Sequence, residues 1–234
     1  MKFLILLPYF NRPNLVRFAI NSVLSQSHTN WQLAICDDGS DVSAQQVLSS
    51  MGIGDSRISI KRIDYRPGEK ESLGSRSGLM LNECMSESNS NIALVLCDDD
   101  GLYPEYLSNL NEFYKNNESC FYSYGHVSIY DPEQFIGLDS LPENNFNIVL
   151  NRTDNLNASY NVDASQVSWR LDEFTRGIFP YPQTANLDAV VFQKLFEAYG
   201  VCVFNNIVAQ YKGWFDDQLG NRIMRGDNGG PRIR

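Results

Sequence analysis

Short apolar segments alternate with stretches of helical periodicity along the first half of the chain. Four segments have the length and composition of β-strands: 3–7, 32–36, 58–63 and 92–96. Continuous apolar runs such as the first and the last are typical of strands covered on both faces in a parallel sheet. After the first strand, Leu15, Phe18 and Val23 recur at the spacing of one helix face. Strands that alternate with helices predict an α/β fold with a mostly parallel, Rossmann-like sheet flanked by helices.

The second half of the chain has a weaker pattern. Segment 121–130 and a later segment, 201–208, are predicted strands, and 186–199 has the periodicity of a helix. Segment 139–161 is rich in Asn, Asp and Ser, which predicts loops facing an acceptor. The glycine-rich end, 226–234, is predicted to be a flexible tail.

Composition and length indicate one domain over 1–234, with a first half at 1–115, a less regular half at 116–225 and the tail. The chain has 234 residues, of which 43% are hydrophobic, enough for one sizeable core. Its net charge of −9 argues against nucleic acid or an anionic membrane as a partner.

Cysteine usage and hydropathy bear on the compartment. The five cysteines are scattered without a C-x-x-C pair, which argues against a disulfide framework and a zinc site. The apolar start ends at Pro8, so it is too short for a signal peptide or a transmembrane segment. We therefore expect a cytoplasmic protein without a transmembrane segment.

Three consecutive carboxylates, Asp98, Asp99 and Asp100, follow the strand at 92–96. Ligands of open α/β sheets bind at the carboxyl ends of the strands. Three crowded acids repel one another unless a cation offsets them, and Mg²⁺ or Mn²⁺ takes oxygen ligands. An acidic turn or a helix N-terminus is the alternative interpretation, but one acid would suffice for capping. The cluster predicts a metal-nucleotide site.

Two further candidates depend on this context. Asp37-Asp38-Gly39-Ser40 ends the strand at 32–36, where Asp38 can accept hydrogen bonds from a nucleobase or a ribose, although acids and glycine are also common in turns. Arg76 begins a predicted helix, and its planar guanidinium suits a diphosphate; the alternative is an ordinary surface arginine.

Several of these motifs occur in succession. They are Leu7-Pro8-Tyr9-Phe10-Asn11-Arg12, Ser22-Val23-Leu24-Ser25-Gln26-Ser27, the stretch from Trp31 to Ser40, and the aspartates followed by Pro104 and Leu107. Over about the first 115 residues this succession resembles the donor-binding half of family 2 glycosyltransferases with the GT-A fold. The resemblance implies a nucleotide-sugar donor, with Pro8 in the donor site, Phe10 and Asp38 at the base, Arg76 near the diphosphate, Asp98 at the ribose, and Asp99 and Asp100 at Mg²⁺ or Mn²⁺. The family usually has an aspartate where Cys97 stands.

The resemblance also implies a general base that takes a proton from the acceptor hydroxyl. Asp217, next to Asp216 at a predicted helix start, best resembles the family's Glu-Asp pair, and Asp188 is the competitor. His28 and His126 are interpreted as structural or surface histidines.

The expected activity is metal-dependent, inverting transfer of one sugar from a UDP-linked donor to a hydroxyl acceptor in glycan or polysaccharide synthesis. Two alternatives stay open at this point. A nucleotidyltransferase of related fold would usually have a glycine-rich basic loop, which the 8–12 segment lacks. A degenerate protein that only binds nucleotide or glycan is the other.

Overall fold

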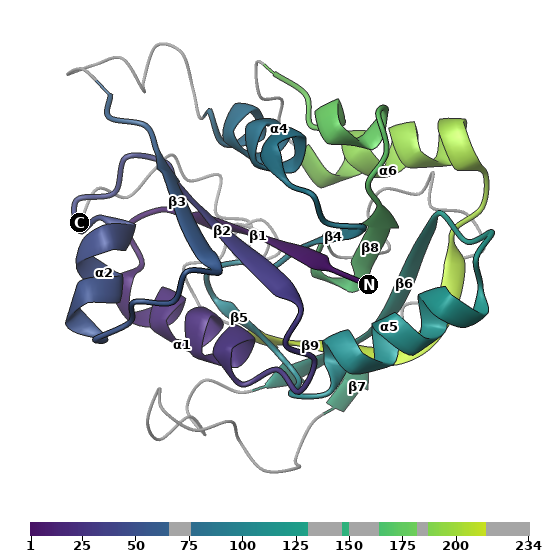
Figure 1. Cartoon of the computed structure of the whole chain (residues 1–234), viewed down its shortest axis with the longest axis horizontal. Helices are drawn as coiled ribbons and strands as arrows, with labels where there is room; N and C mark the ends of the chain where they lie inside the picture. The colour runs from purple at the N-terminus through teal and green to yellow at the C-terminus, as the bar shows by residue number, and fades with distance from the viewer. Residues whose placement is uncertain (66–75, 131–146, 150–163, 182–186, 214–234) are drawn as a thin grey trace, which may run out of the picture.

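The computed structural model describes residues 1–65, 76–130, 147–149, 164–181 and 187–213 (Figure 1). Its first half alternates strands and helices in this order: β1 (Phe3–Tyr9), α1 (Pro13–Leu24), β2 (Trp31–Asp37), α2 (Ala44–Ser50), β3 (Ile58–Arg62), α4 (Ser77–Glu87) and β4 (Ile92–Val95). Strand β1 lies between β2 and β4 and is parallel to both, and β2 is parallel to β3. The predicted α/β fold with βα units is confirmed.

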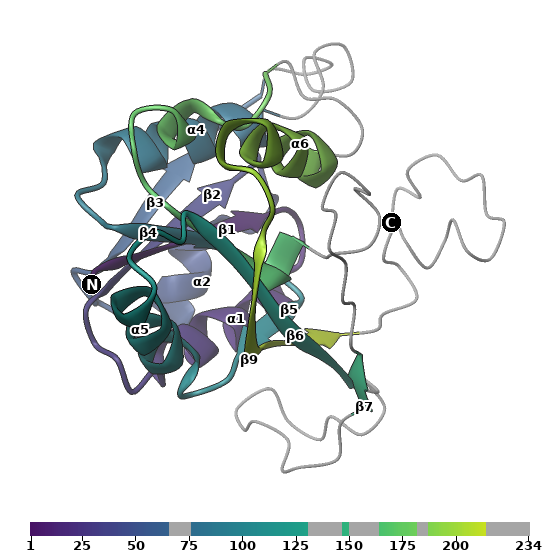
Figure 2. The same ribbon diagram turned by 90° about the vertical axis from the view of Figure 1, so that its right-hand side faces the viewer.

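The second half extends the same sheet with mixed pairing. Its elements are β5 (Asp100–Leu102), α5 (Tyr106–Asn116), β6 (Tyr122–Tyr130), β7 (Asn147–Val149), β8 (Val167–Arg170), α6 (Leu187–Tyr199) and β9 (Val203–Gly213), with 3₁₀ turns at Ala164–Gln166 and Thr175–Gly177. In the part of the chain that the structure describes, the strand order is β3-β2-β1-β4-β8-β6-β9-β5, and β7 pairs with β6. Strand β8 is antiparallel to β4 and β6, whereas β6 and β9 run parallel side by side (Figure 2).

Helices cover both faces of the sheet, because successive side chains of a strand point to opposite faces. Figure 1 shows α1, α2 and α5 on one face and α4 and α6 on the other. In β1, Phe3, Ile5 and Leu7 pack in the first core, and Leu4 and Leu6 pack in the second. All five are at most 2% exposed. Full burial of such a side chain stabilises the fold by roughly 1.5–3 kcal/mol, so β1 anchors both layers.

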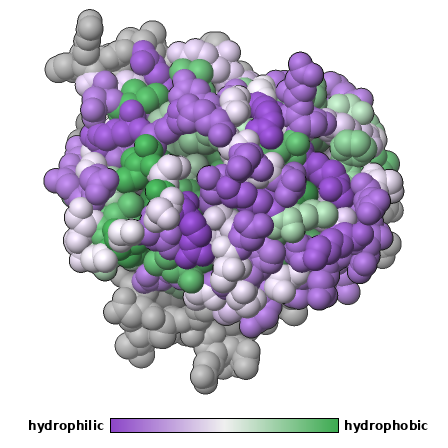
Figure 3. All heavy atoms as spheres, in the orientation of Figure 1, coloured by the Kyte–Doolittle hydropathy of each residue, from purple (hydrophilic) through white to green (hydrophobic). Residues whose placement is uncertain are grey.

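The face drawn in Figure 3 has small, separate apolar areas among hydrophilic side chains. Most large apolar side chains of the described residues are buried in the two cores, as the apolar strands and the one-sided helix of the sequence predict. No helix among the described residues is long and apolar enough to cross a bilayer.

Four short strands or helices were not predicted from the sequence, and one of them, β7, lies within segment 139–161, which was predicted to form loops; its three residues become strand by pairing with β6. Helix α2 begins with a capping box, in which the Gln46 N–H donates to Ser43 Oγ at 3.2 Å and the Ser43 N–H donates to Gln46 Oε1 at 2.8 Å. Strands β5 and β8 have only three and four residues and exist through pairing with distant strands. Segment 216–224, where a late helix was predicted, and the tail at 226–234 lie outside the described residues.

Candidate functional site

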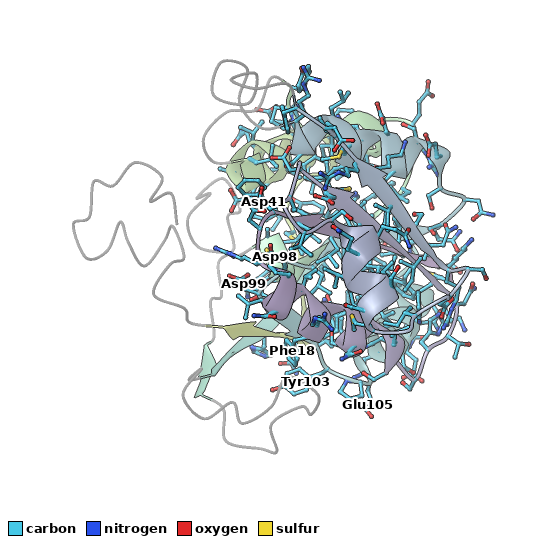
Figure 4. All side chains as sticks on the ribbon, turned by 90° about the vertical axis from the view of Figure 1, so that its left-hand side faces the viewer. Phe18, Asp41, Asp98, Asp99, Tyr103 and Glu105 are labelled. Carbon is cyan, nitrogen blue, oxygen red and sulfur yellow. The ribbon has the colours of Figure 1, made fainter. Side chains whose placement is uncertain are left out.

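The loops after β1, β2 and β4 meet at one edge of the sheet, as the parallel order requires. In Figure 4, Asp98 and Asp99 lie next to each other at this edge, and Asp41 lies nearby on the loop after β2. The predicted candidates Phe10, Asp38, Asp98 and Asp99 belong to these loops, Asp100 follows as the first residue of β5, and Pro8 belongs to the end of β1. The fold therefore brings most of the predicted site together.

Arg12 links two of the three aspartates. Its Nη1 atom lies 2.9 Å from Asp99 Oδ2 and 3.1 Å from Asp98 Oδ1. The Phe10 N–H donates to Asp98 Oδ2 at 3.3 Å. Burial raises the pKa of Asp98 to about 6, even though the Arg12 charge opposes this shift; the neighbouring Asp99 carboxylate adds to it. The loop after β1 is thus bound to the acidic loop after β4.

Asn11 binds the loop after β1 to the loop after β2. Its backbone is in the left-handed region, with φ of 52°, which asparagine tolerates better than most residues. Its N–H donates to Ser40 Oγ at 3.1 Å, and its Oδ1 accepts from the Asp41 N–H at 2.7 Å. The three loops therefore form one connected surface before any ligand is bound.

The adjacent acids Asp37 and Asp38 have different surroundings. Asp37 is fully buried and accepts hydrogen bonds from the N–H groups of Ser40 and Ala44 and from Arg62, at 2.8, 2.9 and 2.7 Å. Asp37 therefore has a structural role, because a buried carboxylate is tolerated only when it is paired. Asp38 is the acid that remains a candidate for the nucleobase.

Tyr65 connects Asp38 to Arg76. The Tyr65 hydroxyl donates to Asp38 Oδ1 and accepts from the Arg76 N–H at 3.0 Å. Burial and the bond to the Asp38 carboxylate raise the pKa of Tyr65 to about 12, so the phenol stays protonated. Gly39 has φ of 79°, and an added Cβ would lie 2.8 Å from the Tyr65 ring. Glycine at this turn therefore lets Tyr65 reach Asp38.

Arg76 immediately precedes α4 and lines a pocket of about 400 Å³ between β3 and α4. Lys61 and Arg62 from β3 line the same pocket. Gly78, in the first turn of α4, lies close to Pro180 and to Leu187, the first residue of α6. A Cβ added at Gly78 would lie 2.6 Å from Pro180 O and 3.7 Å from Leu187 Cδ1. Asp188, the competitor for the general base, is in the first turn of α6. The start of α6 therefore packs against the first turn of α4, which Arg76 precedes.

The acidic loop contains one group of described residues that could hold a metal ion. An Asp99 oxygen, an Asp100 oxygen and the Cys97 sulfur lie within 4.8 Å of one another. Two carboxylates suit a hard ion such as Mg²⁺ or Mn²⁺, whereas a thiolate favours softer ions. Asp100 opens β5, and Gly101 lets that strand approach α1, since a Cβ would lie 2.5 Å from the Phe18 ring. The donor set fits a divalent ion held mainly by Asp99 and Asp100.

Other predicted candidates lie elsewhere. Asp217 is outside the described residues. His28 lies at the opposite end of β1, with its Nε2 2.9 Å from Met1 O, and buried His126 has its Nε2 2.9 Å from Asn206 Oδ1. Both histidines have structural contacts, as interpreted from the sequence.

Sequence reasoning missed Arg12 and Tyr65 as members of the site. Arg12 lies within the motif that carried the resemblance, but its partners are 86 and 87 residues away in sequence. Tyr65 had no recognisable signal apart from its place after a strand.

The sheet, its order and this edge define a GT-A-like α/β protein. The chain belongs to glycosyl transferase family 2, whose sequence model matches residues 4–170.

Two curated relatives share part of the sequence. The chain is 29% identical over 139 residues to the Escherichia coli UDP-Glc:alpha-D-GlcNAc-diphosphoundecaprenol beta-1,3-glucosyltransferase WfgD, covering 59% of this chain and 51% of that protein. It is 28% identical over 106 residues to protein CgeD of Bacillus subtilis, covering 45% of this chain and 24% of that protein. The matched region thus spans about half or less of each relative.

Solved structures show the same fold. S. aureus TarS aligns with a TM-score of 0.62 over 93% of this chain and 37% of its own, at 14% identity. A TarS 1-349 structure in complex with UDP-GlcNAc aligns with a TM-score of 0.62 over 93% of this chain and 60% of its own, also at 14% identity. The predicted GT-A fold is confirmed.

Proposed function

We propose that the protein transfers a single sugar from a UDP-linked donor to a hydroxyl acceptor, with inversion, in glycan or polysaccharide synthesis. The observation that carries this proposal is the joining of three strand-end loops, which gathers Phe10, Asp38 and Asp98 to Asp100 at one edge of the sheet. Membership of glycosyl transferase family 2 supports it. The named substrates of the relatives, a UDP-glucose donor for WfgD and UDP-GlcNAc bound to TarS, favour UDP over other nucleotides.

Each donor contact has a candidate residue. Asp38, held by Tyr65, accepts hydrogen bonds from the base, with Pro8 and exposed Phe10 beside it. Asp98 accepts from the ribose, and Arg76 binds the diphosphate. Asp99 and Asp100 hold Mg²⁺ or Mn²⁺, which when bound supplies Lewis-acid stabilisation of the departing diphosphate.

The acceptor hydroxyl needs a base on the opposite side of the sugar from the leaving group. We propose Asp217 in this role, on its resemblance to the family's acidic pair. Asp188 is the competitor, and the packing of the α6 start against the first turn of α4 favours it. Either carboxylate would remove one proton from the acceptor oxygen as the new glycosidic bond forms.

A thermal-shift and product assay tests the proposal. The protein is heated with UDP, GDP or ADP, with and without Mn²⁺, because a ligand that binds only the folded state raises its stability. Each UDP-sugar is then incubated with the protein and lipid-linked or soluble glycan acceptors, and UDP release and the glycosylated product are measured. We expect stabilisation by UDP with Mn²⁺ and a new glycoside. Stabilisation without UDP release from any donor would instead support the degenerate, binding-only alternative.

A further inference from the structure

Arg12 places a positive charge at the carboxylates expected to hold the metal. One guanidinium nitrogen contacts both Asp98 and Asp99, at 3.1 and 2.9 Å. Asp99 also belongs to the group of ligand atoms formed with Cys97 and Asp100. Asp99 therefore pairs with Arg12 in the structure and is also expected to bind the divalent ion, so the two cations would compete for one carboxylate.

The backbone around Arg12 is held in place, and its side chain is partly exposed to solvent. Asn11 is bonded to Ser40 and Asp41 on one side, and Pro13 begins α1 on the other. The Arg12 side chain is 28% exposed, against 8% for that of Asp99. The guanidinium is therefore nearer to solvent than the Asp99 carboxylate that it contacts.

We propose that Arg12 is the resident counter-cation of the acidic loop, which a divalent ion displaces from Asp99 and which then pairs with the diphosphate of the donor. The ion and the guanidinium are both positively charged, so an ion that binds without nucleotide must first break the ion pair between Arg12 and Asp99, which lowers its affinity. A diphosphate offers the displaced guanidinium a new anionic partner, for which its planar fork is suited. Metal and nucleotide should therefore strengthen each other's binding.

The nucleotide part of this inference rests on the proposed function, whereas the metal part does not. Because coupling between two ligands is reciprocal, it can be measured from the metal side. The test measures the affinity of the full chain for Mn²⁺ alone and with saturating UDP, by calorimetry and by the electron paramagnetic resonance signal of unbound Mn²⁺. The variants are Arg12→Gln and a control, Arg17→Gln, which removes the same charge from within α1, the helix that Arg12 immediately precedes. Arg17 donates to Ser50 Oγ rather than to an acid of the site.

For the wild type and for Arg17→Gln we expect UDP to tighten Mn²⁺ binding about fivefold or more, within the usual range of coupling between sites. For Arg12→Gln we expect Mn²⁺ alone to bind about fivefold tighter than to the wild type, because its competitor is gone. The enhancement by UDP should then be smaller than in the wild type, because the attraction between the ion and the diphosphate remains while the arginine contribution is lost. Arg12→Lys keeps the positive charge but loses the planar guanidinium. Its affinity for Mn²⁺ and the enhancement by UDP should lie between those of the wild type and of Arg12→Gln. It replaces Arg12→Gln in the test if that variant does not fold.

Unchanged or weaker binding of Mn²⁺ alone in Arg12→Gln would overturn the proposal, because Arg12 would then organise the acidic loop rather than compete for it. Equal enhancement by UDP in Arg12→Gln and in the wild type would also overturn it. A chain that binds no UDP in any variant contradicts the proposed function instead. In that case tighter binding of Mn²⁺ alone to Arg12→Gln would still support displacement.

Discussion

The two halves of the sheet place their buried polar groups differently. In the parallel half, buried Asp38, Asp98 and Asp99 gather at the strand ends, where a ligand can reach them. In the second half, buried polar groups bond to one another in the interior. The Tyr114 hydroxyl donates to Ser168 O at 2.8 Å, and Asn205 donates to Ser123 Oγ at 2.9 Å.

This contrast teaches that buried polar residues of one protein can serve two purposes. At the strand ends they line a surface that a ligand can reach, whereas between β6, β8 and α5 they bind one another and hold the paired strands together. Substitutions in the first group should change binding, and substitutions in the second should change stability.

The largest effect should come from the general base. Asp217→Asn should lower kcat by roughly a hundredfold or more, because general-base catalysis is lost, and donor affinity should stay within about threefold. Steady-state transfer kinetics and UDP titration measure the two quantities. If Asp188→Asn abolishes transfer while Asp217→Asn stays active, the base lies at the start of α6; normal turnover of both would refute a carboxylate base at either position.

Asp37→Ala should cause the next largest effect, on folding rather than on binding. The change removes a fully buried acceptor of two backbone N–H groups and of Arg62, so the free energy of unfolding should fall by about 3 kcal/mol. Urea denaturation measures this change. Asp38→Ala is the matched control and should lose less, about 1 kcal/mol, because Asp38 is not fully buried and the backbone N–H groups of the turn donate to Asp37 instead; equal losses in both variants would remove the distinction between the adjacent acids.

Asp38→Ala should weaken binding of UDP selectively. An unpaired nucleobase group costs about 1–3 kcal/mol, so affinity for UDP should drop while affinities for GDP and ADP change little. Tyr65→Phe should move affinity in the same direction by a smaller amount, since it removes the hydroxyl that holds Asp38. A uniform loss across the three nucleotides would mean that Asp38 has a structural role.

The smallest effect should come from Tyr114→Phe in the second half. Loss of the buried hydroxyl leaves Ser168 and Ser123 with one partner fewer, which should cost about 1 kcal/mol of unfolding free energy. Affinity for UDP should stay the same within about twofold. A marked change in nucleotide affinity would contradict the division of duties between the two halves.

The strands of the parallel half could be predicted because each is a local segment with its own pattern: β1, β2 and β4 are largely buried apolar runs, and β3 alternates apolar and polar residues. Helix α2 could have been predicted too, since Ser43 and Gln46 have the spacing of a capping box. Strands β5 and β8 could not, because three or four residues become strand only through distant partners.

The candidate site was predictable to a similar extent. Acids at strand ends follow from parallel topology, so Asp38 and the 98–100 cluster could be brought together by argument. The contacts of these acids could not be predicted. Asp37, rather than Asp38, has the structural role because it binds Arg62 and the N–H of Ala44 at the start of α2, and neither contact follows from the local sequence. The contact of Arg12 with Asp98 and Asp99 depends on a side-chain direction that sequence spacing does not specify.

Binding of UDP by the Asp99→Asn variant, with and without Mn²⁺, tests the central claim most directly. Asparagine keeps the size of the side chain and removes the charge that a metal ion requires. Titration calorimetry should show that Mn²⁺ strengthens UDP binding to the wild type and has no effect on Asp99→Asn, while circular dichroism shows both chains folded. An undiminished effect of Mn²⁺ in Asp99→Asn would contradict the assignment of this edge as a metal-assisted donor site.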